Sequence, residues 1–224
     1  MQLSRRELAK MIDSTLIKPA ASKDEVIKLC WDAQKYGFGC VVVNPTFVSL
    51  VRHMLEATDV KVCSTVGFPI GAGLPEVKAF EAQKVVELGA EEIDMVMNTS
   101  ALKSRDYEGV KKDIQAVLKV KKSSQNVVVK VIIETGLLTD EEKTTACRLA
   151  KEAGADFVKT STGLLGGVAT VKDVKLMRKV VGNDMGVKAA GGIRTLKEAL
   201  AMIKAGANRI GTSTGVAIIE ELTA

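Results

Sequence analysis

Two lysines lie inside short apolar segments of the kind that form buried β-strands. Lys159 lies in DFVKTSTG (156–163) and Lys188 lies in GVKAAGG (186–192). An ammonium group buried in an apolar interior is unfavourable unless it is paired or loses its proton. At the ordinary lysine pKa of about 10.4, only about one side chain in a few thousand is a neutral nucleophile at pH 7, and burial beside a second cation increases that fraction. The two lysines therefore predict amine chemistry, although their spacing does not say which one is the nucleophile.

Alternate side chains of a strand face the same side, which links these lysines to further charged residues. The same period places Asp94 in EIDMVMN (92–98) and Lys130 in KVIIETG (130–136) on inward rows of their own strands. If all four rows face one interior, repulsion among the lysines favours a neutral amine, and Asp94 can hold or transfer protons. For Lys130 alone, a position at a strand end or pairing with one acid is the simpler interpretation. For Lys159, Lys188 and Asp94 together we favour a catalytic role, because shifted charges gather at active sites.

Glycine-rich segments near the carboxyl end of the chain predict phosphate binding. They are AGGIRT (190–195) and IGTSTG (210–215), and the pair TG (162–163) follows Lys159 closely. Glycines let backbone N–H groups approach an anion, and barrel enzymes often bind phosphate in the loops after strands seven and eight. The alternative interpretation is that these are ordinary turn glycines.

Short β-branched runs alternate with helical patterns along the chain. The predicted strands are 12–16, 40–43, 61–66, 93–97, 127–134, 156–161, 187–190 and 209–212. The predicted helices are 23–36, 45–57, 75–88, 107–121, 139–153, 171–181, 195–205 and 214–222. Glycine-alanine pairs at 89–90, 154–155 and 206–207 mark helix ends. This rhythm predicts an α/β fold, a single-domain (β/α)8 TIM barrel over residues 1–224 with a short N-terminal helix. A doubly wound sheet is the alternative, but no G-x-G-x-x-G follows the first strand.

Composition narrows the class of protein further. The 224 residues are 46% apolar, which suffices for one large core, and the net charge of +5 comes from bases interleaved with acids. We expect no nucleic-acid partner, no membrane partner and no signal peptide. The four cysteines are widely spaced and only one histidine is present, so we expect reduced thiols, a cytoplasmic location and no metal site.

Six segments resemble the deoxyribose-phosphate aldolase family of class I aldolases. They are IDSTLIKP (12–19), GFPIG (67–71), EIDMVMN (92–98), KVIIET (130–135), FVKTSTG (157–163) and VKAAGGIRT (187–195). The resemblance implies reversible cleavage of 2-deoxy-D-ribose 5-phosphate into D-glyceraldehyde 3-phosphate and acetaldehyde, in deoxyribonucleotide catabolism. It also implies a lysine Schiff base, no cofactor and a homo-oligomer, either a dimer or a tetramer.

The resemblance also assigns residue roles. It implies that Lys159 forms the Schiff base and that Asp94 and Lys188 donate or accept protons. The implied substrate-binding residues are Thr162, Gly163, Gly191, Gly192, Gly211, Ser213, Thr214, Lys130 and Asp13.

The chain departs from the family pattern at three places. Many relatives have a histidine where this chain has Ser14. Some have a phosphate-binding lysine shortly after the Ser-Thr-Gly motif, where this chain continues with LLGG (164–167). The sequence ends EELTA, without a carboxy-terminal tyrosine. The phosphate would therefore be held without a lysine after the Ser-Thr-Gly motif.

Two other functions remain open. One is another Schiff-base barrel acting on a phosphorylated sugar, transaldolase-like or a keto-sugar aldolase, which would yield a different donor product. The other is a non-catalytic barrel that binds a phosphate ligand or nucleic acid, which would show salt-sensitive binding without aldehyde chemistry.

Overall fold

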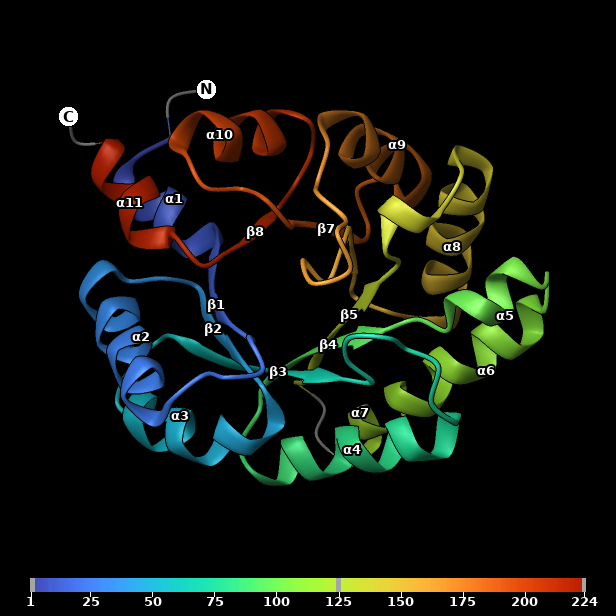
Figure 1. Cartoon of the computed structure of the whole chain (residues 1–224), viewed down its shortest axis with the longest axis horizontal. Helices are drawn as coiled ribbons and strands as arrows, with labels where there is room; N and C mark the ends of the chain where they lie inside the picture. The colour runs from blue at the N-terminus through green and yellow to red at the C-terminus, as the bar shows by residue number, and fades with distance from the viewer. Residues whose placement is uncertain (1–2, 124–125, 223–224) are drawn as a thin grey trace.

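Eight parallel strands close into a barrel in the computed structural model, which describes residues 3–123 and 126–222 (Figure 1). The strands are β1 (Ile12–Leu16), β2 (Cys40–Val43), β3 (Lys61–Val66), β4 (Glu92–Val96), β5 (Val128–Ile132), β6 (Phe157–Lys159), β7 (Gly186–Ala190) and β8 (Arg209–Thr212). Each strand pairs with the next one along the chain, and β8 pairs with β1. The predicted (β/α)8 barrel is confirmed, and the open-sheet alternative is excluded.

A helix on the outside follows every strand. These helices are α2 (Lys23–Tyr36), α3 (Val48–Leu55), α4 (Pro75–Glu87), α6 (Tyr107–Leu118), α8 (Asp140–Ala153), α9 (Val171–Val181), α10 (Leu196–Lys204) and α11 (Gly215–Glu221). The predicted N-terminal helix is α1 (Arg5–Met11). The helical stretch predicted at 45–57 consists of two helices, η1 (Pro45–Phe47) and then α3. The stretch predicted at 107–121 likewise covers α6 and the start of a separate helix, α7 (Val120–Ser123). The structure adds α5 (Thr99–Lys103) and η2 (Thr135–Leu137), which the sequence pattern does not predict.

Local sequence signals explain where many of these helices begin and end. Ser22 caps α2 in a capping box with Glu25, and Thr139 caps α8 in the same way with Glu142. At the other ends, the glycines of the three glycine-alanine pairs have positive φ angles, with values of 106°, 94° and 115° at Gly89, Gly154 and Gly206. The left-handed region suits glycine, so each glycine ends its helix and returns the chain to the barrel.

The two faces of the sheet differ in chemistry. The large hydrophobic core contains the outward-facing residues of the strands, such as Val41, Ile93 and Val187, packed beneath the helices. The inward rows carry charged groups, among them Asp94 and Lys188, beside a small separate apolar cluster of Cys40, Val42 and Cys63. The strands are therefore buried on both faces, as near-continuous apolar runs predict, but the barrel interior is polar.

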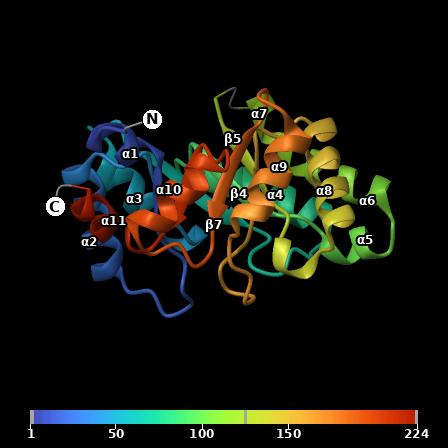
Figure 2. The same cartoon turned by 90° about the horizontal axis from the view of Figure 1, so that it is seen from above.

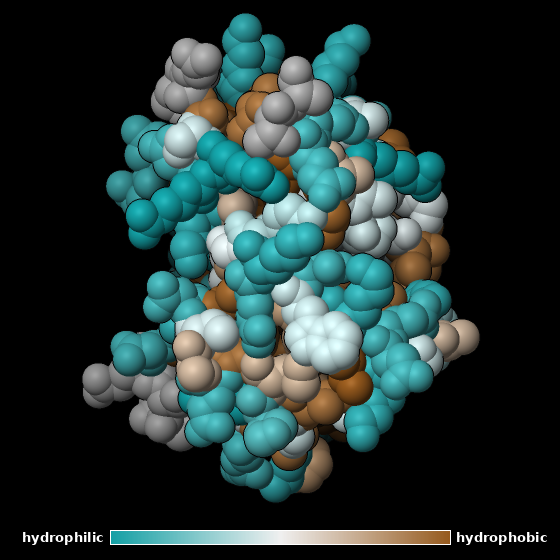
Figure 3. All heavy atoms as spheres, turned by 90° about the vertical axis from the view of Figure 1, so that its left-hand side faces the viewer, coloured by the Kyte–Doolittle hydropathy of each residue, from teal (hydrophilic) through white to brown (hydrophobic). Residues whose placement is uncertain are grey.

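One side of the outer surface is largely hydrophilic. The side that carries α2, α3 and α11 is dominated by hydrophilic side chains with small apolar areas between them (Figure 3). Among residues 3–123 and 126–222, no helix is long and apolar enough to cross a membrane. The loops after β1 and β6 project from the same end of the barrel (Figure 2). Barrel enzymes carry their active sites at the carboxyl ends of the strands, where these loops lie.

Candidate active site

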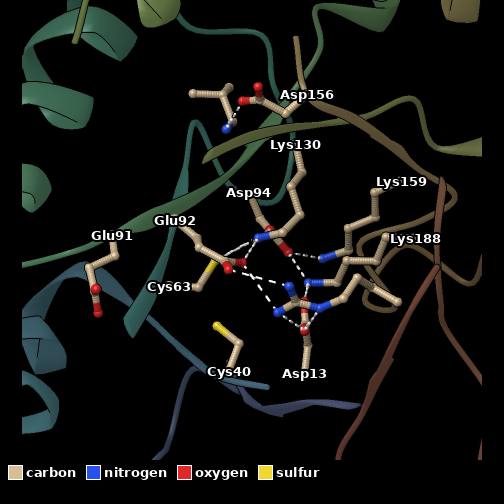
Figure 4. Close-up of polar contacts among 12 residues, drawn as sticks. Asp13, Cys40, Cys63, Glu91, Glu92, Asp94, Lys130, Asp156, Lys159 and Lys188 are labelled. Atoms are coloured by element: carbon tan, nitrogen blue, oxygen red, sulfur yellow. Dashed lines mark hydrogen bonds and ion pairs between the residues drawn. The ribbon is translucent and has the colours of Figure 1, made fainter. Parts of the chain in front are cut away.

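Asp94 lies at the centre of a buried cluster of ion pairs inside the barrel (Figure 4). Its Oδ1 atom accepts hydrogen bonds from Nζ of Lys130 at 2.9 Å and from Sγ of Cys63 at 3.3 Å. Its Oδ2 atom accepts hydrogen bonds from Nζ of Lys159 and from Nζ of Lys188, each at 2.7 Å. The structure thus brings together the acid and the three lysines that the sequence places on inward rows.

Strand register explains this convergence. Asp94 on β4 is the direct partner of Lys130 on β5, and Lys159 on β6 is the direct partner of Lys188 on β7. The register between β5 and β6 sets Ile132 beside Lys159, which places the two pairs at neighbouring heights in the barrel. Since paired residues of adjacent strands project to the same face, all four side chains enter the interior.

A second layer of charged groups surrounds this centre. Asp13 on β1 contacts Nζ of Lys188 at 2.5 Å and accepts a hydrogen bond from Nε of Arg209 on β8 at 2.6 Å. Glu92 on β4 contacts Nζ of Lys130 at 2.6 Å and the Arg209 guanidinium at 3.4 Å. Lys130 is therefore fully buried between two acids, not at a strand end, and Asp13 serves both Lys188 and Arg209.

The charges of this cluster do not cancel when every group is ionised. Its acids are Asp13, Glu92 and Asp94, and its bases are Lys130, Lys159, Lys188 and Arg209. The bases exceed the acids by one. Because net charge in a buried interior is costly, deprotonation of one lysine balances the cluster.

Among the three lysines of the cluster, Lys159 is the one whose pKa is lowered. Burial lowers the pKa of Lys159, and the Lys188 ammonium adds to this effect against the opposing Asp94 carboxylate. Burial alone would lower the pKa of Lys188, but Asp13 and Asp94 outweigh it and raise that pKa. The pKa of Lys130 is likewise raised well above its usual value, with burial opposed chiefly by Asp94. Burial would raise the pKa of Asp94, yet the surrounding lysines hold it well below its usual range.

A cavity of about 270 Å³ opens above this cluster at the loop end of the strands. Of the four bases in the cluster, all within the part of the chain that the structure describes, only Lys159 lines it.

Five of the residues predicted to bind substrate also line the cavity, namely Thr162, Gly163, Gly191, Gly211 and Ser213. Gly192 and Thr214 lie next to lining residues without lining the cavity themselves. Asp13 and Lys130 lie below it and contact the other charged groups. The arrangement sets the Lys159 amine at the cavity wall, with a carboxylate and a second lysine buried beside it.

The pattern of strand residues predicts the wrong backbone conformation for Glu134, which contacts a residue of the cavity wall. The sequence predicts a strand through residue 134, whereas β5 ends at Ile132 and Glu134 adopts a left-handed conformation with φ of 52°. Its buried Oε2 atom accepts a hydrogen bond from the backbone N–H of Thr162 at 2.9 Å. The side chain therefore fixes the start of the loop after β6, which forms part of the cavity wall.

Several other residues of the cavity wall and the charge cluster are not among the site residues predicted from the sequence. The cavity wall includes Thr15, Leu16, Ile17 and Lys18 from the end of β1 and the loop that follows it. Glu92 and Arg209 complete the charge cluster. Glu92 lies two residues before Asp94, so the period of the strand already gives a signal for it, whereas nothing in the local sequence indicates Arg209.

Among the described residues, one group of potential metal ligands overlaps the cluster. Ligand atoms of Cys40, Cys63 and Glu92 lie within 4.8 Å of one another, and all three residues are buried. The Glu92 carboxylate already contacts Lys130 and Arg209. A metal ion here would have to displace these cations, so the cluster fits its own ion pairs better than a metal.

Comparisons with known proteins agree with this geometry. The sequence profile described as DeoC/LacD family aldolase matches residues 8–221. A deoxyribose-phosphate aldolase of Thermoanaerobacter sp. (strain X514) is 61% identical over 214 residues, which cover 96% of each chain. One from Thermococcus kodakarensis is 60% identical over 220 residues, covering 97% of this chain and 98% of the relative.

A solved structure gives the same result in three dimensions. It is described as a tetrameric deoxyribose phosphate aldolase from Aeropyrum pernix and superposes with a TM-score of 0.92. The sequences are 38% identical, and the match covers 100% of this chain and 94% of the other. With its buried lysine cluster and closed barrel, this chain belongs to the DeoC/LacD aldolase family.

Proposed function

We propose that this protein reversibly cleaves 2-deoxy-D-ribose 5-phosphate into D-glyceraldehyde 3-phosphate and acetaldehyde. One observation carries the proposal. Lys159 alone among the four described bases of the cluster lines the cavity, and burial lowers its pKa. The names of this chain's relatives supply the substrate class. The glycine-rich loops at the same cavity suit a phosphate.

The reaction begins with the neutral amine of Lys159. The amine attacks C1 of the open-chain sugar, and the resulting carbinolamine loses water to form an iminium ion. The C3 hydroxyl then gives up its proton, its oxygen forms the new carbonyl, and the C2–C3 bonding electrons move toward the iminium nitrogen. D-glyceraldehyde 3-phosphate leaves, and an enamine stays on Lys159. Protonation of the enamine at C2 and hydrolysis release acetaldehyde and restore the amine.

Asp94 and Lys188 are the proton carriers in this proposal. A carboxylate with a lowered pKa and an ammonium with a raised pKa meet at one atom, Oδ2 of Asp94, which also contacts Nζ of Lys159. Because Nζ of Lys159 and Nζ of Lys188 each lie 2.7 Å from this oxygen, a proton can pass among these groups with little movement, directly or through water.

Reductive trapping tests the proposal. Incubation with acetaldehyde and borohydride should leave a stable ethyl adduct on Lys159, located by peptide mass spectrometry. An adduct on Lys188 or Lys130 would overturn the assignment. A product assay separates the nearest rivals, since dihydroxyacetone phosphate or a transferred ketose unit without acetaldehyde would favour a different Schiff-base barrel.

We also infer self-association and a cytoplasmic location. The Aeropyrum pernix relative is described as tetrameric, and the four cysteines of this chain are free and buried, as in reducing compartments. Light scattering coupled to gel filtration tests the first inference, and cell fractionation tests the second.

A further inference from the structure

The cavity has one positively charged side chain at its rim. Its lining includes two charged residues among those described, Lys159 at the bottom and Lys18 in the loop between β1 and α2. The apolar residue Leu164, directly after the Ser-Thr-Gly motif, also lines it. Among the described lining residues, Lys18 is therefore the only charged side chain besides Lys159 that a phosphorylated substrate could meet.

Strand pairing brings Lys18 to the phosphate-binding loops. β1 is hydrogen-bonded to β8, with Ser14 opposite Thr212. The residues after Ser14 consequently lie beside those that follow Thr212, and Lys18 and Ser213 line the same cavity. Gly191 and Gly211 contribute backbone to that part of the wall. Lys18 thus stands on the side of the cavity where glycine-rich loops can surround an anion.

A weak ion pair holds the Lys18 side chain at this rim. Its Nζ atom lies 2.5 Å from Oε1 of Glu25, and the two side chains are 49% and 44% exposed. The other carboxylate oxygen of Glu25 accepts a hydrogen bond from the backbone N–H of Ser22 at 2.9 Å, so Glu25 is fixed by its helix cap. Exposed pairs of this kind contribute little to stability. The ammonium can therefore exchange Glu25 for a more highly charged phosphate.

We propose that Lys18 binds the phosphate group of the substrate and supplies the selectivity for phosphorylated over unphosphorylated sugars. This inference rests on the proposed aldolase function. The long side chain reaches from the loop after β1 toward the phosphate, while Lys159 reacts at the aldehyde end. Glu25 competes with the phosphate and retains the lysine when the cavity is empty.

The test compares two substrates in the Lys18→Met variant. The KM for 2-deoxyribose 5-phosphate should rise about 10- to 100-fold with little change in kcat, as expected for loss of a charge-assisted contact. The ratio of kcat/KM for 2-deoxyribose 5-phosphate to that for 2-deoxyribose should fall by the same factor. Lys18→Arg should retain most of this ratio. An unchanged ratio in Lys18→Met would overturn the inference.

Two further variants sharpen the result. Lys23→Met removes an exposed lysine five residues away and should leave both substrates unaffected, which controls for general loss of surface charge. Glu25→Gln keeps the side-chain oxygen that caps α2 but removes the competing charge. Its KM for 2-deoxyribose 5-phosphate should fall, and a higher KM would contradict the competition between Glu25 and phosphate.

The failure of this inference can be separated from failure of the proposed function. Acetaldehyde trapping on Lys159 does not involve a phosphate, so the unaltered protein and Lys18→Met should both form the adduct. If the unaltered protein forms none, the aldolase proposal fails. If both form it but Lys18→Met loses activity equally on both substrates, only the role of Lys18 fails.

Discussion

The Nζ atom of Lys159 lies 2.7 Å from Oδ2 of Asp94, and both groups are buried. The attraction of this carboxylate opposes the lowering of the lysine pKa. Yet Asp94 also contacts two other lysines, so its charge is shared among three ammonium positions. The central acid therefore stabilises the cluster without raising the pKa of Lys159 above its ordinary value.

Substitution of Asp94 with asparagine should separate these two roles. The Asp94→Asn side chain has nearly the same shape but cannot accept a proton, so kcat should fall about 10²- to 10⁴-fold. It also leaves the cluster with two acids and four bases, and the free energy of unfolding should fall by about 3 to 5 kcal/mol. Steady-state kinetics and urea unfolding measure the two effects. A variant with nearly normal kcat would exclude Asp94 from proton transfer.

The pH dependence of adduct formation should depend on Lys188. Lys159 reacts only when neutral, so borohydride trapping with acetaldehyde should become faster as pH rises through its lowered pKa, below the ordinary value of 10.5. Lys188→Met removes the neighbouring cation, so the pKa of Lys159 should rise and the acid limb should move to higher pH. Lys175→Met, an exposed lysine on α9, is the control and should leave the limb in place. A limb that moves to lower pH in Lys188→Met would contradict this coupling.

A second buried ion pair supports the strand that carries Asp94. Lys78 on α4 lies 2.7 Å from Asp113 on α6, and its Nζ atom also donates a hydrogen bond to the carbonyl of Val96 at 2.9 Å. Lys78→Met leaves the Asp113 carboxylate buried without its cation, so the free energy of unfolding should fall by about 3 to 5 kcal/mol.

The double variant Lys78→Met/Asp113→Asn provides the matched comparison. It removes the uncompensated charge while the asparagine oxygen can still accept the backbone N–H of Asn98, as Asp113 does at 3.2 Å. Much of the lost stability should return in urea unfolding curves. If the double variant is as unstable as the single one, uncompensated charge is not the cause.

Much of the fold and the centre of the site follow from the period of the strands. Alternation places Asp94, Lys130, Lys159 and Lys188 on inward rows, and barrel closure makes those rows converge. Helix boundaries are also close to prediction because caps and terminal glycines are local signals. These features depend on residues near one another in the chain, which is why the sequence alone is sufficient for them.

Features that depend on distant contacts were not predictable in this way. The difference between the lowered pKa of Lys159 and the raised pKa of Lys188 depends on Asp13, which contacts Lys188 from a strand 175 residues earlier in the chain. The left-handed conformation of Glu134 is unusual for a non-glycine residue and is compatible with the hydrogen bond to Thr162 in the loop after β6. No periodicity in KVIIET encodes that turn.

The contact between Glu134 and Thr162 should act on substrate binding. Glu134→Ala removes the acceptor of the Thr162 N–H, so the loop after β6 should lose its fixed position and KM should rise more than kcat falls. Glu134→Gln retains an acceptor oxygen of the same reach and should recover most of the KM, because the hydrogen bond does not require a negative charge. Steady-state kinetics on all three proteins, with melting temperatures to control for folding, distinguish the outcomes. If Glu134→Gln is as impaired as Glu134→Ala, the charge of Glu134 and not its hydrogen bond is what the site requires, and the carboxylate would then belong with the proton carriers.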